Sequence, residues 1–457
     1  MKVHSCQHHH RGPAGAGDLY YPGLGNGGYN ARHYDLALKV DPAANQVEGR
    51  ATMEASATEA LDTFHLDFHG CQVDKVQVNG KPATFTRQED ELVIRPADPL
   101  QQGEDFAVAV EYSGSPQAKT SVCSPFLVGW KNRGHGVVVD SQPDGAQTWI
   151  PVNDHPRDKA TYSMKIEVPK PYVVAANGTL LGIEDHGSTQ SFSFQTRDPM
   201  ASYLATVNIG NYVLDQQDGP VPIRNYFPPE LVEKARYDFG RTPEMIEFFS
   251  GLFGPYPFEN YGVVVVNDPE AVAGAMETQT LSLFEPALVT GDRANEDVVA
   301  HELAHHWFGN LVSVSQWRDL WLHEGFASYA EWLWLEHTQG TEALDKKAAD
   351  TREWLSRQPG VTIGEPPKDD LFNGQVYIKG ALALHELRRK IGDEAFFTGC
   401  RTYLERHQGE GAANPTISDL QKVMEESSGH QLTGFFQDWL YTAELPAAGD
   451  ADKLTQR

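Results

Sequence analysis

Two histidines four residues apart, with a glutamate directly after the first, constrain this chain more than any other feature. The stretch is His301-Glu302-Leu303-Ala304-His305. Positions i and i+4 share one face of an α-helix, so the two imidazoles can grip one metal ion if the stretch is helical. The Gly-Asn pair that follows can end such a helix. Glu302 is rotated by about 100° from His301, which places its carboxylate beside the metal without making it a ligand.

A third metal ligand is expected downstream, because zinc with two histidines needs another protein ligand and one open position. Eighteen residues separate His305 from Glu324. The segment 318–337 around Glu324 has apolar residues at helical spacing and is predicted to be a second helix. Glu324 completes a set of two histidines and one glutamate. Glu331 lies two turns further on the same face, where it can hydrogen-bond a ligand histidine.

The motif must be weighed against chance, because a bare H-E-x-x-H also occurs in long chains without a metal site. The glutamate at this spacing, inside a second amphipathic helix, favours the metal site. Two further histidines, His306 and His323, lie off the required faces. We interpret both as packed or solvated side chains and not as ligands.

Three stretches of the sequence resemble the M1 family of zinc aminopeptidases, which also contains leukotriene A4 hydrolase. The first is the run HELAHHWFGNLVSVSQWRDLWLHEGFASY at 301–329. The second, Gly274 to Glu277, resembles the GxMEN signature of the family. The third, VYIKGA at 376–381, resembles the stretch that carries the catalytic tyrosine. The resemblance extends from about Tyr29 to Pro446, which is most of the chain.

The resemblance implies a hydrolytic zinc site with one Zn²⁺ per chain. His301, His305 and Glu324 would hold the metal. Glu302 would be the general base for the attacking water, and the Tyr377 hydroxyl would stabilise the oxyanion.

The resemblance also implies how a peptide is bound. Glu277 would pair with the free α-ammonium of the substrate, and Gly274 would let the backbone approach it. Ala275 and Met276 belong to the same substrate-binding signature. By position, Gln142 matches a Gln or Glu that lines the pocket near the amine.

Two positions depart from the family pattern. Thr278 stands where the family usually has Asn, and His323 stands where Asn usually precedes the zinc-binding glutamate. Thr is shorter than Asn and is branched, so we expect a different shape for the loop that holds Glu277.

Periodicity divides the chain into two domains between two tails. Residues 18–215 alternate apolar and polar positions between turn signals, which predicts an all-β N-terminal domain. Residues 216–446 are predicted to form a mostly α, α+β catalytic domain, in which AGAMETQTLSLF would be an edge strand with Glu277 at its start. The resemblance implies a saddle-like β domain and a thermolysin-like catalytic domain. Residues 1–17 and 447–457 are predicted to be flexible tails.

Composition limits the partners of the chain. Lys and Arg number 37 against 63 Asp and Glu, a net charge of −26, which argues against nucleic acid as a partner. No apolar run reaches the length of a membrane span. The N-terminus has no apolar leader, so we expect a cytoplasmic protein, with secretion left open if the true N-terminus differs. Four scattered cysteines indicate no disulfide framework, although a Cys71–Cys123 bridge stays open.

The leading functional hypothesis is a zinc aminopeptidase that acts on peptides with a free N-terminus. A thermolysin-like endopeptidase has the same zinc core but does not need Glu277. An epoxide hydrolase resembling leukotriene A4 hydrolase and a non-enzymatic scaffold are further alternatives. The resemblance implies a short two-domain form without the helical C-terminal domain of longer members. The preferred N-terminal residue and the oligomeric state stay open.

Overall fold

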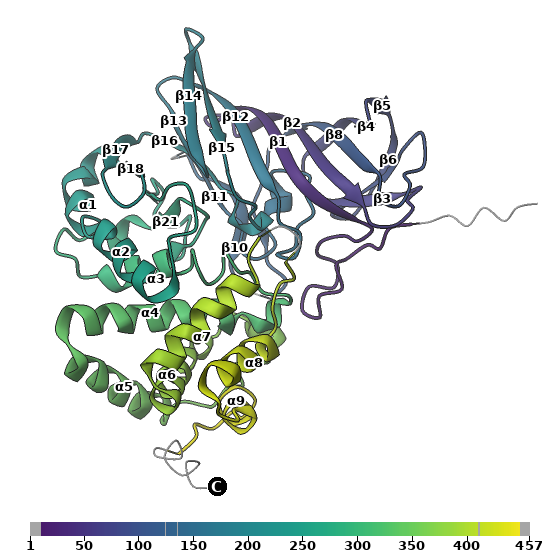
Figure 1. Cartoon of the computed structure of the whole chain (residues 1–457). Coiled ribbons are helices and arrows are strands. Elements are labelled where there is room, and N and C mark those ends of the chain that lie inside the picture. Colours follow the sequence, from purple (N-terminus) through teal and green to yellow (C-terminus); the bar gives the residue numbers. More distant parts are fainter. Residues whose placement is uncertain (1–10, 124, 135, 410–411, 448–457) are drawn as a thin grey trace, which may run out of the picture. The chain divides into compact units, whose positions relative to one another are not determined.

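The computed structural model describes residues 11–447 apart from 124, 135, 410 and 411. The chain separates into two compact units, Met1–Ser121 with Phe126–Tyr212, and Val122–Pro125 with Val213–Arg457. The first unit is built from strands and the second mainly from helices, which Figure 1 draws in purple to teal and in teal to yellow. The predicted fold class, a β-rich part followed by a mostly helical part, is confirmed.

An eight-stranded sheet forms the largest part of the first unit. Its strand order is β14-β15-β12-β1-β2-β8-β4-β5, and only β1 and β12 run parallel. Buried and exposed residues alternate along β1 and β8, so one face of the sheet is packed and the other faces water. The strands are β1 (Tyr29–Asp41), β2 (Gln46–Ala57), β4 (Gln72–Val78), β5 (Lys81–Pro82), β8 (Asp105–Gly114), β12 (Thr161–Pro169), β14 (Thr179–Asp185) and β15 (Thr189–Gln195).

Two smaller sheets complete the first unit. One has the order β13-β16-β11-β10-β9 and the other β3-β7-β6. Short 3-10 turns at Ala146–Thr148 and Ser202–Leu204 connect strands. The strands are β3 (Phe64–Asp67), β6 (Thr84–Gln88), β7 (Glu91–Arg95), β9 (Lys119–Thr120), β10 (Leu127–Asn132), β11 (Val137–Asp140), β13 (Val173–Ala176) and β16 (Val207–Gly210).

The start of the described chain corrects the prediction of a flexible N-terminal tail for residues 11–17. The Gly12 N–H donates to the Thr63 carbonyl at 3.0 Å, and the Ala16 N–H donates to the Leu24 carbonyl at 2.9 Å. These backbone hydrogen bonds hold the segment against the first unit. Residues 1–10 of the predicted tail, and 448–457 of the predicted C-terminal tail, lie outside the described residues.

A mixed five-stranded sheet lies in the second unit, in the order β17-β18-β19-β21-β20. The sequence predicts one edge strand over the segment 273–284, with Glu277 near its start. The segment is a hairpin instead, because β20 pairs antiparallel with β21 and Glu277 follows the end of β20. Of the two hairpin strands, β20 lies at the edge of the sheet and β21 lies inside it. The strands are β17 (Val213–Gln217), β18 (Ile223–Phe227), β19 (Val263–Val265), β20 (Ala275–Met276) and β21 (Ser282–Phe284).

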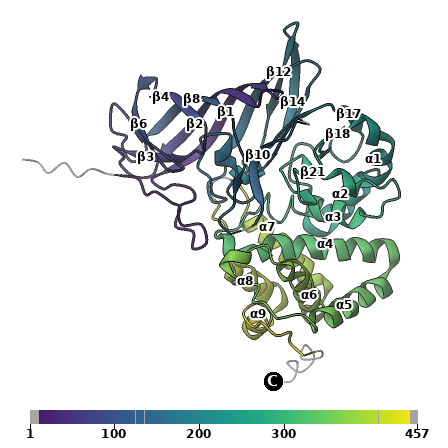
Figure 2. The ribbon, with the colours of Figure 1, turned by 180° about the vertical axis from the view of Figure 1, so that it is seen from behind.

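Helix α4 is the centre of the helical unit. It packs against α3 on one side and against α5 and α6 on the other, as both ribbon views show (Figure 1, Figure 2). Its side chains are buried almost without interruption from Trp321 to Trp334. The helices are α1 (Val232–Asp238), α2 (Thr242–Phe253), α3 (Glu296–Ala304), α4 (Trp321–Gln339), α5 (Thr341–Leu355), α6 (Gly374–Ile391), α7 (Asp393–Arg406), α8 (Ile417–Ser428) and α9 (Thr433–Leu440).

Helices α4 and α6 cross at two glycines. A Cβ placed on Gly380 of α6 would lie 2.9 Å from the Gly325 Cα of α4, which is closer than such atoms approach in real structures. The absence of a side chain at both positions therefore lets the two helix backbones meet. Gly325 directly follows Glu324, and Gly380 lies one turn after Tyr377. The crossing thus sets the separation of these two functional candidates.

The described residues also bear on the predicted absence of a membrane span and on the Cys71–Cys123 bridge that the sequence left open. No helix among them is long and apolar enough to cross a membrane. Cys71 is a buried free thiol, so it forms no bridge with Cys123.

Candidate metal centre

Three side chains, from α3, its C-cap residue and α4, converge at one point in the second unit. The Nε2 atoms of His301 and His305 are 3.1 Å apart. Glu324 Oε2 is 3.3 Å from the first of these nitrogens and 3.2 Å from the second. Tetrahedral coordination by nitrogen and oxygen ligands at about 2.0–2.1 Å separates the ligand atoms by about 3.3 Å. The spacing of the three atoms therefore fits a zinc ion.

The second nitrogen of each histidine has a partner that frees Nε2 for a metal. His301 Nδ1 lies 2.7 Å from Glu331 Oε1 on α4. His305 Nδ1 lies 3.1 Å from the Phe308 carbonyl oxygen. A carboxylate and a carbonyl accept hydrogen bonds and cannot donate, so each Nδ1 carries a proton. The lone pair of each neutral imidazole is then on Nε2, as in metal-binding histidines.

The buried carboxylates around His301 and His305 favour positive charge at the two imidazoles. Although burial opposes it, hydrogen bonds to Glu324 and Glu331 hold the pKa of His301 well above its usual value. At His305, burial lowers the pKa of the imidazole, but the negative charges of Glu324 and Glu277 together outweigh burial and raise the pKa to about 9. Both shifts mean that the buried carboxylates attract positive charge to these nitrogens. A divalent metal ion bound between these side chains would supply this positive charge.

The end of α3 differs from the prediction. The helix was expected to run to Gly309, but it ends at Ala304 and His305 is its C-cap residue. Because His305 keeps right-handed helical angles, φ −55° and ψ −25°, the spacing of the two histidines is preserved. Tighter turns follow, in which Trp307 N–H bonds to the Ala304 carbonyl three residues back.

Glu302 and Glu277 are two buried carboxylates beside the three converging side chains. Glu302 is 5% exposed and its Oε2 has no hydrogen-bond partner in the described structure. Glu277 is 3% exposed, and ligand-type atoms of Glu277, Glu302 and His305 lie within 4.8 Å of one another. Burial raises the pKa of both carboxyl groups above their usual values. Each carboxyl group is therefore placed to accept a proton or to bind a cationic group.

Tyr377 approaches this cluster from α6. Its ring stacks on that of His301, with centroids 6.1 Å apart and planes 15° from parallel. Burial, with the charges of Glu324 and Glu277, raises the pKa of the phenol well above its usual value. The hydroxyl is consequently protonated at neutral pH and can donate a hydrogen bond.

The other residues predicted to bind substrate lie in two places. Gly274, Ala275 and Met276 lead into Glu277 on the edge of the five-stranded sheet, and Gly274 has a φ of +83° that favours glycine. A Cβ on Gly274 would meet nothing within 4 Å, so its backbone angle, not crowding, explains the glycine. Gln142 belongs to the first unit, in the loop after β11, and its role stays a prediction.

Sequence reasoning missed the residues that hold Glu277 in place. The Asn310 side-chain amide donates to the Glu277 carbonyl at 2.8 Å, although the sequence suggested only that Asn310 could end a helix. Thr278 Oγ1 donates to the Leu281 carbonyl. The threonine at the position of the family's Asn thus closes the turn after Glu277, which no local signal indicated.

The two histidines set aside as packed side chains are buried. The His323 Nε2 accepts a hydrogen bond from the Val314 N–H at 3.0 Å. His306 is fully buried and bonds to backbone groups on both sides of its ring. Neither belongs to the groups of potential metal ligands found among the described residues, which are His301, His305 and Glu324, and Glu277, Glu302 and His305.

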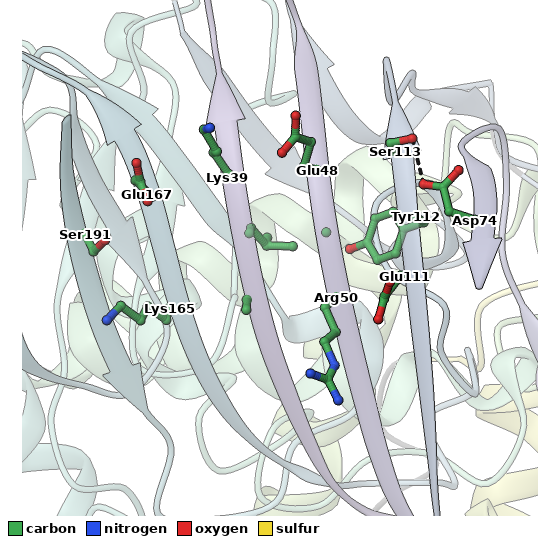
Figure 3. A pocket seen from close by; sticks show the side chains of 13 residues that line it. Lys39, Glu48, Arg50, Asp74, Glu111, Tyr112, Ser113, Lys165, Glu167 and Ser191 are labelled. Atoms are coloured by element: carbon green, nitrogen blue, oxygen red, sulfur yellow. Dashed lines mark hydrogen bonds between the residues drawn. The ribbon is translucent and has the colours of Figure 1, made fainter. Parts of the chain in front are cut away.

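A groove of about 560 Å³ lies on the water-facing side of the eight-stranded sheet (Figure 3). Basic and acidic side chains from neighbouring strands face each other there, among them Lys39, Arg50 and Glu48. Lys165 pairs with Glu184 at 2.7 Å. No histidine or cysteine is among the residues that line the groove. It therefore lacks the ligand chemistry of the centre on α3 and α4.

Family profiles match both parts of the chain. Residues 30–204 match the Peptidase M1 N-terminal domain, and residues 237–439 match the Peptidase family M1 domain. The M1 zinc metallopeptidase of Deinococcus radiodurans is 31% identical, with a TM-score of 0.86 over 95% of this chain and 98% of that one. A variant of that enzyme was solved with a Tyr-Ser-Ala substrate. The chain belongs to the M1 peptidase family.

Longer relatives include named aminopeptidases. Leucyl aminopeptidase of Saccharolobus solfataricus is 27% identical over 440 residues, which cover 90% of this chain and 53% of that protein. Glutamyl aminopeptidase of Sus scrofa is 26% identical over 470 residues, covering 93% of this chain and 48% of that protein. The chain therefore spans about half the length of these curated relatives.

Proposed function

We propose that this chain is a zinc aminopeptidase, a hydrolase that releases the N-terminal residue of peptides. The observation that carries the proposal is the convergence of His301, His305 and Glu324, whose ligand atoms are separated by 3.1–3.3 Å, beside the buried carboxylate of Glu277. The aminopeptidase names of the relatives, and the peptide bound by the Deinococcus enzyme, support the same function.

His301, His305 and Glu324 would hold one Zn²⁺. When bound, the metal supplies a Lewis acid for the scissile carbonyl and lowers the pKa of water towards neutrality. Glu302 takes the proton of the attacking water and passes it to the leaving amine. Its buried Oε2, without a competing hydrogen bond in the described structure, supports this role.

Tyr377 would donate its hydroxyl hydrogen bond to the oxyanion that forms at the carbonyl. The raised pKa of the phenol supports a donor that stays protonated. The position of the ring against His301 keeps this donor beside the metal ligands.

Glu277 would restrict the enzyme to the first peptide bond. The Glu277 carboxyl group is buried beside the proposed metal ligands, where it can bind a cationic group, and the α-ammonium of a peptide provides one. Gly274 and the two residues of the edge strand, Ala275 and Met276, precede Glu277 and would contact the first residue of the peptide. An N-terminally blocked peptide has no charge to offer, so it should bind poorly.

A panel of amino acid amides and anilides, each free and N-acetylated, tests the proposal. The free compounds should be hydrolysed, 1,10-phenanthroline should abolish the activity, and added zinc should restore it. Glu277→Ala should raise KM for the free compounds, while zinc content stays unchanged. Equal cleavage of acetylated and free substrates would instead indicate an endopeptidase. No cleavage of either kind by the zinc-loaded protein would refute the peptidase function.

A further inference from the structure

His306 directly follows a candidate metal ligand but belongs to neither group of potential metal ligands among the described residues. Its ring is fully buried. It stacks on Tyr256 with centroids 5.7 Å apart, and the edges of Phe258 and Tyr261 approach at 5.7 and 5.0 Å. Apolar side chains would fill such an aromatic pocket equally well, so packing alone does not explain an imidazole there.

Both nitrogens of the His306 ring bond to the backbone. Nδ1 lies 3.2 Å from the Glu302 carbonyl oxygen, and the Thr280 N–H donates to Nε2 at 3.0 Å. A carbonyl can only accept and an amide N–H can only donate, so Nδ1 carries the proton and the ring is neutral. The ring therefore connects the backbone of Glu302, the proposed general base, to the turn after Glu277 through two hydrogen bonds.

The turn after Glu277 contains a strained residue that requires stabilising contacts. Thr280 has a φ of +66°, a left-handed conformation that a β-branched residue seldom adopts. The turn closes through the Leu281 N–H, which bonds to the Thr278 carbonyl at 3.0 Å. Asn310 fixes the other end at the Glu277 carbonyl. The hydrogen bond from the Thr280 N–H to His306 thus connects the strained part of the turn to the segment after α3.

We propose that His306 is a positioning residue for recognition of the substrate α-ammonium. By holding Thr280 at a set distance from the Glu302 carbonyl, the neutral imidazole fixes the turn that follows Glu277. It thereby sets where the Glu277 carboxylate lies relative to His301, His305 and Glu324. The inference rests on the proposed function of Glu277 as the ammonium ligand.

The matched test compares His306→Leu with His306→Gln. Leucine fills the pocket but leaves the Thr280 N–H without its acceptor. Glutamine places an amide oxygen near the position of Nε2 and can accept that bond again. His306→Leu should raise KM for free-amine substrates about 2- to 12-fold, which is the loss of one neutral hydrogen bond of about 0.5–1.5 kcal/mol converted at 1.4 kcal/mol per factor of ten. His306→Gln should return KM to within about twofold of the native value. The kcat should change less than KM.

His385→Leu is the control for loss of a buried imidazole. His385 is 4% exposed, lies on α6, and packs against Tyr329 and Trp332. Its described hydrogen-bond contact is with the Tyr329 hydroxyl, and none of its described bonds reaches the turn after Glu277. His385→Leu should lower the melting temperature and leave KM at the native value. A similar rise of KM in both leucine variants would overturn the proposal, since it would show a general effect of core damage.

Hydrogen exchange gives a readout that does not depend on activity. In His306→Leu, peptides that cover 278–284 should exchange faster, while His306→Gln and His385→Leu should match the native protein. Unchanged exchange and unchanged KM in His306→Leu, or loss of zinc from that variant, would overturn the proposal. If the native protein cleaves no substrate, the aminopeptidase function fails by itself, and faster exchange in His306→Leu alone would still support the positioning contact.

Discussion

The hydrogen bond between Glu331 and His301 should set the zinc affinity of the centre. The two atoms are 2.7 Å apart, and the Glu331 side chain is 23% exposed. A hydrogen bond to a charged group contributes about 1.5–3 kcal/mol, against about 0.5–1.5 for a neutral one. Glu331→Gln keeps an acceptor but loses the charge, which removes about 1–1.5 kcal/mol. Glu331→Ala loses both, although water can enter at this partly exposed position.

Converted at 1.4 kcal/mol per factor of ten, the loss of about 1–1.5 kcal/mol in Glu331→Gln should weaken zinc binding about 10-fold, and the loss of about 1.5–3 kcal/mol in Glu331→Ala should weaken it about 10- to 140-fold. The range agrees with the effect of residues that orient metal-binding histidines. Competition for zinc against a chelating dye at fixed pH measures the dissociation constant without relying on catalysis.

Glu336→Gln is a closely matched control. Glu336 lies five residues further along α4, its side chain is 21% exposed, and it pairs with Arg388 at 2.7 Å. This substitution also removes one charge from a paired carboxylate on the same helix, but it should leave zinc affinity unchanged. Equal weakening in Glu331→Gln and Glu336→Gln would refute the reasoning, because the effect would then come from the net charge of α4. So would an unchanged affinity in Glu331→Ala.

Three further outcomes can be checked. Glu302→Gln should keep its zinc, measured by metal analysis, but lose most of its turnover, because an amide cannot accept the proton; near-native rates would remove Glu302 from the mechanism. Tyr377→Phe should lower kcat about 10²- to 10³-fold with little change in KM in steady-state assays, and an equal change in both constants would contradict the role of an oxyanion donor. Gly380→Ala should destabilise the fold by about 1–3 kcal/mol in denaturant unfolding and reduce kcat, since its Cβ would separate α4 from α6; a fully stable and active variant would show that the crossing tolerates a side chain.

The parts of the site that depend on local periodicity could be predicted from the sequence. His301 and His305 are four apart, so their shared face follows from helix geometry alone, and Glu324 shares a face of the second helix with Glu331 in the same way. That these two faces meet comes from the packing of α3 against α4. The prediction that Glu331 faces a histidine rests on the same argument, and the structure brings the two side chains together. The roles of these residues stay predictions.

The parts that depend on irregular or distant structure could not be predicted. The helix ends at Ala304 because tighter turns begin there, and these turns direct His306 towards Thr280. The hairpin at 273–284 looked like one strand, because its turn has a threonine with positive φ in place of a glycine. The approach of Tyr377 to the proposed zinc ligands depends on a contact between Gly325 and Gly380, which are 55 residues apart in the sequence.

The division of the proposed zinc ligands between two helices has a consequence for the lifetime of the protein. Both histidines come from α3 and its cap, and both glutamates that hold them come from α4. A bound ion therefore cross-links the two helices, and its binding free energy adds to the free energy of unfolding. At a free metal concentration 1,000 times the dissociation constant, this linkage supplies about 4.1 kcal/mol. In a metal-starved cell the chain is expected to unfold more often and to be degraded sooner, so zinc supply would control the amount of protein as well as its activity.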